Sequence, residues 1–105
     1  MLKIVLLLIL LAAHGASDAA GQLPMDVRVF VKNADLCEHM AGEWDSELPK
    51  KEMRDIERGI TKYCAPARQQ LRILQKKYQA YPAVLKAISK HAYDSVKDYS
   101  ENFGS

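Results

Sequence analysis

The hydrophobic residues of this chain recur every three or four positions, which is the spacing of an amphipathic helix. The first such stretch predicts a helix over residues 26–41, followed by Gly42, which suits the left-handed residue that often ends a helix. Its apolar positions are Val27, Phe30, Val31, Ala34, Cys37, Met40 and Ala41.

A second apolar pattern runs from Met53 to Tyr78 through Ile56, Ile60, Tyr63, Cys64, Ala67, Leu71 and Leu74. Pro66 lies inside it, and an interior proline removes a backbone hydrogen bond at a cost of about 3 kcal/mol. Because the pattern keeps its phase across Pro66, we expect a kink there rather than a full break. Residues 43–49 connect the two helices, and Asp45 or Ser46 should accept hydrogen bonds from the first amides of the second.

A last helix should begin near Pro82 and carry Val84, Leu85, Ile88, Ala92, Val96 and Tyr99. The polar tail, residues 100–105, should fray. The fold class is therefore all-α: a small bundle of three helices, or four if Pro66 breaks the second. We place the helical domain at residues 26–99, after a lead-in at residues 20–25.

The first residues have the pattern of a secretory signal peptide, which we place at residues 1–19 with cleavage between 15 and 21. Lys3 precedes an unbroken apolar run from Ile4 to Ala13, and small residues follow. The alternative is a membrane anchor, but the run is half of the roughly 20 residues that span a bilayer. We expect an exported chain, periplasmic or secreted, with no transmembrane segment after the signal.

Export would place the two cysteines, Cys37 and Cys64, in an oxidising compartment, which predicts one disulfide between them. A simple helical hairpin would not bring the two cysteines together, because strictly antiparallel helices would put Cys37 opposite Met53 or Ile56. A partner about ten residues further along a helix is displaced by roughly 15 Å, whereas bridged Cα atoms lie within about 7 Å. Either the second helix begins late, or its first turns fold back, or the helices cross steeply. We therefore expect residues 43–52 to form an extended or wrapped segment.

Basic residues dominate the second half of the chain, although the net charge is only +2. No acidic residue lies between Arg58 and Tyr93, whereas residues 26–57 lean acidic. The two halves could neutralise each other across helix faces, or a basic face could meet an acidic partner or the anionic cell envelope. The candidate binding residues on that face are Arg68, Arg72, Lys76 and Lys77.

The connection at residues 43–49 contains the only tryptophan, Trp44, between Glu43 and Asp45. Trp44 either covers the small core or serves as an exposed anchor for a partner, the role in which tryptophan is enriched at interfaces. We include Trp44, Glu43 and Asp45 among the candidate binding residues. The tyrosines of the basic half have helical spacing, which favours core positions over stacking on nucleic acid.

Cys37, His39, Glu43, Asp45 and Cys64 include the ligand types that zinc takes. Cys-x-His on a helix separates its two side chains by about 200°, and a disulfide would consume both thiols. We therefore expect no metal, no cofactor and no enzymatic activity. The remaining candidates for a metal or general-base site are His39 and Glu43, which are four residues apart.

A run of Cys37-x-His39-x-x-Gly42-Glu43, then Cys64, Leu71, Lys77-Tyr78 and Pro82, resembles a family of small exported proteobacterial proteins of unknown function. The resemblance covers about residues 33–88, and Met40 stands where the family pattern has phenylalanine. It implies a helical, disulfide-bearing periplasmic protein of Gram-negative bacteria and no reaction. It also implies that His39, Gly42 and Glu43 form a local structural motif beside Cys37.

Our leading hypothesis is a protein that binds another envelope protein, in an inhibitor, immunity-like or adaptor role. One alternative is a metal-binding or enzymatic site at His39 and Glu43. Another is a binder of the anionic envelope surface through the basic helix face. Nucleic acid is not an expected partner, and the sequence leaves the oligomeric state open.

Overall fold

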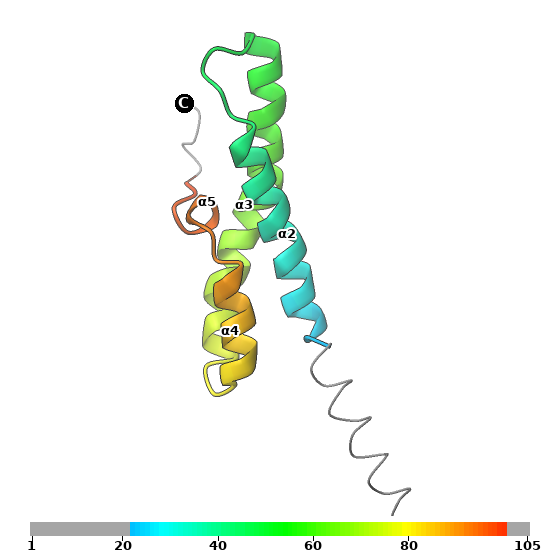
Figure 1. Cartoon of the computed structure of the whole chain (residues 1–105), viewed down its shortest axis with the longest axis vertical. Coiled ribbons are helices and arrows are strands. Elements are labelled where there is room, and N and C mark those ends of the chain that lie inside the picture. Colours follow the sequence, from blue (N-terminus) through cyan, green and yellow to red (C-terminus); the bar gives the residue numbers. More distant parts are fainter. Residues whose placement is uncertain (1–21, 101–105) are drawn as a thin grey trace, which may run out of the picture.

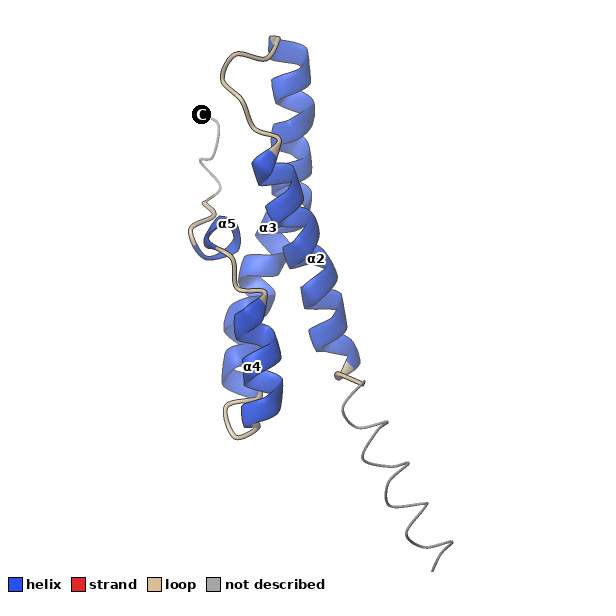
Figure 2. Ribbon diagram, viewed as in Figure 1, coloured by secondary structure: helices blue, strands red, loops and turns tan. Residues whose placement is uncertain are grey.

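The computed structural model describes residues 22–100, and this part of the chain is α-helical without strands (Figure 2). The helices are α2, Met25–Gly42; α3, Lys50–Lys77; α4, Pro82–Lys90; and α5, Asp94–Lys97. This confirms the all-α prediction. Within residues 22–100, no helix has the length and apolar character needed to cross a membrane. The predicted signal peptide and residues 101–105 of the predicted tail lie outside the described residues.

The core forms chiefly between α2 and α3, and α5 packs against both of them. Helix α3 is continuous through Pro66, so the prediction that this proline does not break the helix is confirmed. Figure 1 shows α3 running along the whole bundle and changing direction about halfway. The buried core residues are Val27, Phe30, Ala34, Cys37, Ile60, Cys64, Ala67, Leu71, Leu74, Ile88, Val96 and Tyr99.

A disulfide joins Cys37 of α2 to Cys64 of α3, with the Cα atoms 4.7 Å apart and both residues fully buried. The predicted link is therefore confirmed. The end of α2 lies beside the third turn of α3, because Met40 packs directly against Gly59. Residues 50–58 of α3 consequently extend past the end of α2.

The connection at residues 43–49 makes this offset register possible. In Figure 1 it rises from the end of α2 to the far end of α3 alongside the overhanging turns. Seven connecting residues can span more than 20 Å when extended, and the overhang of α3 is only about 13 Å long. The expectation of an extended or wrapped segment holds for residues 43–49 in its wrapped form, because they are non-helical and include a turn in which Leu48 donates its N–H to the carbonyl of Asp45. Residues 50–52 are already helical.

The ends of these two helices differ from the predictions. Gly42 does not end α2 in a left-handed conformation, because it lies within the helix and its φ is not positive. The following residue, Glu43, is right-handed (φ −82°, ψ −11°) and donates its N–H to the carbonyl of Met40. Neither Asp45 nor Ser46 caps α3, which begins after Pro49 without a side-chain cap. Asp45 instead accepts the N–H of Glu47 at 2.9 Å within the connection.

The predicted last helix is wrong in its continuity, because it divides at residues 91–93 into α4 and α5. The fourth helix therefore arises from this division and not from Pro66. His91 and Tyr93 both bind Asp35 of α2 through their side chains, which redirects the chain across the bundle. Val96 and Tyr99 remain buried because α5 then packs on α2 and α3.

Candidate binding surface on α3

The first acidic side chain of α2 is neutralised within the bundle. Asp26 accepts hydrogen bonds from the Lys77 ammonium at 2.7 Å and from the Tyr78 hydroxyl at 2.8 Å, both at the end of α3. The Lys77 bond is the main reason that the pKa of Asp26 lies below its ordinary value of 3.8. The same contact raises the pKa of Lys77. The N-terminal turn of α2 is thereby tied to the last turn of α3.

Further along α2, Asp35 and Glu38 bind the C-terminal elements. Asp35 Oδ1 lies 2.8 Å from His91 Nδ1 and accepts the Tyr93 hydroxyl at 2.7 Å, and Glu38 accepts the Ser95 hydroxyl at 3.1 Å. Desolvation pushes the pKa of Asp35 upward, but the bonds from Tyr93 and His91 outweigh it, so that pKa is lowered. The hydrogen bond to Asp35 raises the pKa of Tyr93 to about 12.

These contacts show which groups the acidic residues of α2 pair with. Asp26 binds the end of α3, and Asp35 and Glu38 bind the C-terminal elements, so these three acidic residues of α2 do not neutralise the outer surface of α3. Sequence reasoning did not identify the Asp35, His91 and Tyr93 cluster. Its only signal was two polar ring side chains flanking Ala92 inside an otherwise apolar helix pattern.

The outer side of α3 carries two groups of exposed basic residues on one line, interrupted at Ala65 and Gln69. We call them together the basic stripe: Arg54, Arg58, Lys62, Arg72 and Lys76. At about 100° per residue these positions fall within one narrow sector of the helix, opposite the core residues Ile60, Cys64 and Leu71. Arg58 pairs with Asp55 one turn before it. Among residues 22–100, Arg54, Arg72 and Lys76 form no ion pair.

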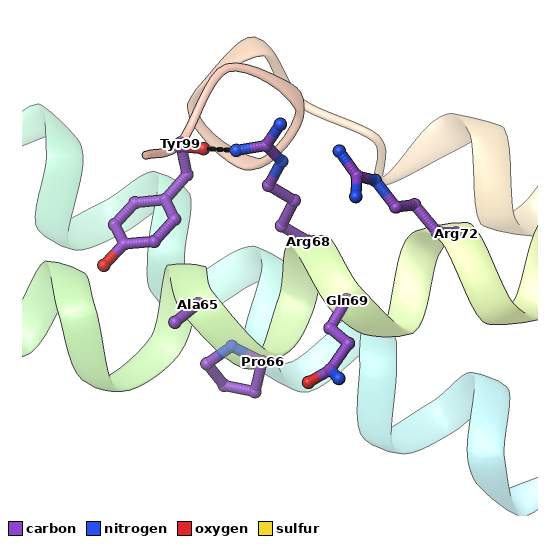
Figure 3. Close-up of a pocket in the computed structure, with 6 residues that line it drawn as sticks. All are labelled: Ala65, Pro66, Arg68, Gln69, Arg72 and Tyr99. Atoms are coloured by element: carbon purple, nitrogen blue, oxygen red, sulfur yellow. Dashed lines mark hydrogen bonds between the residues drawn. The ribbon is translucent and has the colours of Figure 1, made fainter. Parts of the chain in front are cut away.

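Two hollows lie along the basic stripe. The first, of about 560 Å³, is lined by Arg54, Glu57, Arg58, Thr61 and Lys62. The second, of about 650 Å³, lies at Pro66 and is lined by Ala65, Pro66, Arg68, Gln69, Arg72 and Tyr99. Figure 3 shows Arg68 and Arg72 rising from α3 toward the α5 turn, where Arg68 donates to the backbone carbonyl of Tyr99.

The structure places the predicted basic residues in two directions. Arg72 and Lys76 belong to the basic stripe, and Arg68 borders it at the second hollow. Lys77 turns toward α2 and pairs with Asp26. The expectation of neutralisation between the two halves therefore applies to Lys77, and the other three residues keep their charge at the surface without a carboxylate among residues 22–100.

The predicted site around Trp44 lies apart from the basic residues. Trp44 is 42% exposed on the connection, and Glu43 and Asp45 beside it are exposed. The start of the connection lies next to Gly59 of α3, and Arg72 is about 20 Å further along that helix. The two predicted parts of the site therefore do not form one compact surface.

His39 and Glu43, the predicted low-priority metal or general-base pair, lie one helical turn apart. Their side chains approach to 3.9 Å between Nε2 and Oε1 and are 66% and 57% exposed. In the described part of the chain, no group of three or more histidine, cysteine, aspartate or glutamate side chains is placed to hold a metal ion. The pair therefore supplies two donors at an open surface.

Comparisons with protein-family models, with curated proteins and with solved structures find no match to this chain. The family resemblance carried by the Cys37 to Glu43 run stays a prediction. The basic stripe and the connection are the features of the described residues that bear on function.

Proposed function

We propose that this chain is an exported helical protein that acts by binding an acidic protein of the cell envelope, in an inhibitor, immunity-like or adaptor role. The observation that carries the proposal is the basic stripe, whose arginine and lysine side chains face away from every acidic residue of α2. Among the described residues, only Arg58 of this row pairs with a carboxylate. The remaining like charges repel one another, and an acidic surface would relieve this repulsion and steer association.

The surface beside the basic stripe supports protein recognition in particular. Ile73 is 58% exposed next to Arg72, and Val29 of α2, which is 44% exposed, lines the same shallow groove of about 330 Å³. Arginine combined with exposed apolar side chains is a composition typical of protein interfaces. The disulfide supports the export part of the proposal, because such bonds persist mainly in oxidising compartments.

The test is capture from a Gram-negative envelope, with the full chain expressed with its own leader and cross-linked before purification. The Arg72→Gln/Lys76→Gln variant removes two charges from the basic stripe. Lys86→Gln/Lys90→Gln is the matched control, because these exposed residues of α4 have the same four-residue spacing and lie off the stripe. We expect a specific protein to be captured by the wild type and the control and lost from the stripe variant.

Two other outcomes would overturn the proposal. If both double variants retain the same captured proteins, the stripe does not mediate recognition. If the wild type instead binds anionic phospholipid vesicles in a salt-sensitive manner and captures no protein, the ligand is the envelope surface.

Trp44→Ala belongs in the same experiment, and we expect it to weaken capture while leaving the melting temperature nearly unchanged.

A further inference from the structure

The hollow at Pro66 differs from the first hollow in that its charged lining is purely basic, whereas Glu57 also lines the first. Two guanidinium groups, those of Arg68 and Arg72, line it one helical turn apart, and no carboxylate lines it. Arg68 donates one N–H to the backbone carbonyl of Tyr99. This acceptor is neutral, so it leaves the positive charge of Arg68 uncompensated. Figure 3 shows both side chains extending to the same side of α3.

We infer that this hollow is a subsite for a carboxylate of an extended acidic segment of the partner, held between Arg68 and Arg72; the inference rests on the proposed function. A guanidinium presents parallel N–H donors whose spacing matches a carboxylate, and such charge-assisted bonds are shorter and stronger than neutral ones. Two guanidiniums on one side of a helix can therefore hold one carboxylate from two directions.

The rest of the lining indicates what adjoins that carboxylate. Ala65 and Pro66 supply an apolar edge, and Figure 3 shows the ring of Tyr99 above Ala65. Gln69 and Pro66 extend to the other side of α3 from the two arginines (Figure 3), so the Gln69 amide can bond to the backbone of the segment beyond the carboxylate. These features fit a glutamate or aspartate beside an apolar residue, in a segment narrow enough to enter the hollow.

Arg68 is held in place before any ligand arrives. Its bond to Tyr99 attaches it to the core, because the Tyr99 residue is only 6% exposed. A donor that is already ordered loses less conformational entropy on binding. Arg72 is exposed and makes no ion pair within residues 22–100, so it is the residue to substitute without disturbing α5.

The experiment measures binding of a fluorescein-labelled peptide, in which two glutamates flank a leucine, to the purified protein by fluorescence anisotropy. Arg54→Gln is the matched control for Arg72→Gln, because residue 54 lies five full turns earlier on the same sector of α3. We expect Arg72→Gln to weaken binding about tenfold and Arg54→Gln by less than about threefold. Arg72→Lys should recover only part of the binding, since lysine keeps the charge but lacks the paired N–H donors of the guanidinium.

Equal losses in Arg72→Gln and Arg54→Gln would overturn the subsite, because binding would then follow the overall charge of the stripe. Absence of peptide binding, together with envelope capture that still depends on Arg72 and Lys76, would overturn the subsite and leave the proposed function standing. Displacement of the peptide by citrate at similar concentrations would make the ligand a free small carboxylate and would overturn the partner segment. A glutamine-substituted peptide that binds equally well would also overturn it.

Discussion

The hydroxyl of Tyr93 donates a hydrogen bond of 2.7 Å to the carboxylate of Asp35, across 58 positions of the chain. His91 Nδ1 lies 2.8 Å from the same oxygen, so two side chains at the division between α4 and α5 meet one carboxylate of α2. The contact anchors the chain where it turns to send α5 back over the core. It also favours the protonated tyrosine, which explains why the pKa of Tyr93 rises to about 12.

The Tyr93→Phe variant should lose about 1 kcal/mol of unfolding free energy at neutral pH, because Asp35 loses a hydrogen-bond donor. Because the pKa of Tyr93 is raised in the folded state, its contribution to stability is fully present below the unfolded pKa of 10. That contribution is lost as the pH rises toward the folded pKa of about 12. The wild type should therefore lose stability across that window, and the variant should lack this part of the decline. Urea unfolding measured over the same pH range checks both effects.

Tyr81→Phe is the control for that measurement, because Tyr81 is 59% exposed and its hydroxyl bonds to no residue of the described part. Its stability should equal that of the wild type. If Tyr93→Phe behaves in the same way as Tyr81→Phe at every pH, the contact with Asp35 does not contribute to folding.

The loss of stability at low pH should depend on Asp26 and Asp35. Both carboxyls have a pKa below 3.8 in the folded protein, because the hydrogen bond from Lys77 stabilises the charged Asp26 and bonds from Tyr93 and His91 outweigh the desolvation of Asp35. A lowered pKa contributes stability above the unfolded value, and that contribution disappears as the pH falls through the folded one. Melting temperatures should therefore fall below about pH 4.

The Asp26→Asn/Asp35→Asn variant should be less stable than the wild type at neutral pH and should show a flatter acid decline. Asp98→Asn, at an exposed position of the α5 end, is the control and should retain the full decline. Parallel curves for the wild type and the double variant would show that these two carboxyls do not govern the loss of stability at low pH.

The amphipathic spacing was sufficient to predict α2, α3 and most of the core, because each buried side chain follows from its own position along a helix. The amphipathic spacing alone does not give the register between α2 and α3, since a seven-residue connection can either turn at once or run along the neighbouring helix. The predicted disulfide between Cys37 and Cys64 supplied the offset and left open how the connection accommodates it. The division at residues 91–93 depends on Asp35, far away in the sequence, so no local pattern could reveal it. The different orientation of Lys77 follows from its angle on α3, which a helical projection could have shown.

The contact between Gly59 and Met40 provides a separate test of the register. A Cβ atom at position 59 would collide with the terminal methyl of Met40 and lie 3.3 Å from its sulfur. Alanine is favoured over glycine inside a helix by about 1 kcal/mol, so Gly59→Ala should gain that amount only if Met40 can move away. In a Met40→Ala background the gain should appear in full, and in the wild type it should be smaller.

A double-mutant cycle of these two substitutions, measured by urea unfolding, gives the coupling energy directly. A coupling of at least about 0.5 kcal/mol is expected for side chains in contact. Equal effects of Gly59→Ala in the two backgrounds would mean that Met40 does not pack on Gly59, and the offset between α2 and α3 would then be incorrect.

Removing the disulfide should cost this small domain a large part of its stability. The bond closes a loop with a sequence separation of 27, for which the chain-entropy model gives about 3.5 kcal/mol. The Cys37→Ala/Cys64→Ala variant should therefore unfold at a much lower urea concentration than the oxidised protein.

Because both sulfur-bearing residues are fully buried, dithiothreitol should reduce the native protein slowly, at a rate that rises with urea as the bundle opens. Rapid reduction without urea would show that the bond lies at the surface, and equal unfolding midpoints for the two proteins would show that the loop closure does not stabilise the fold.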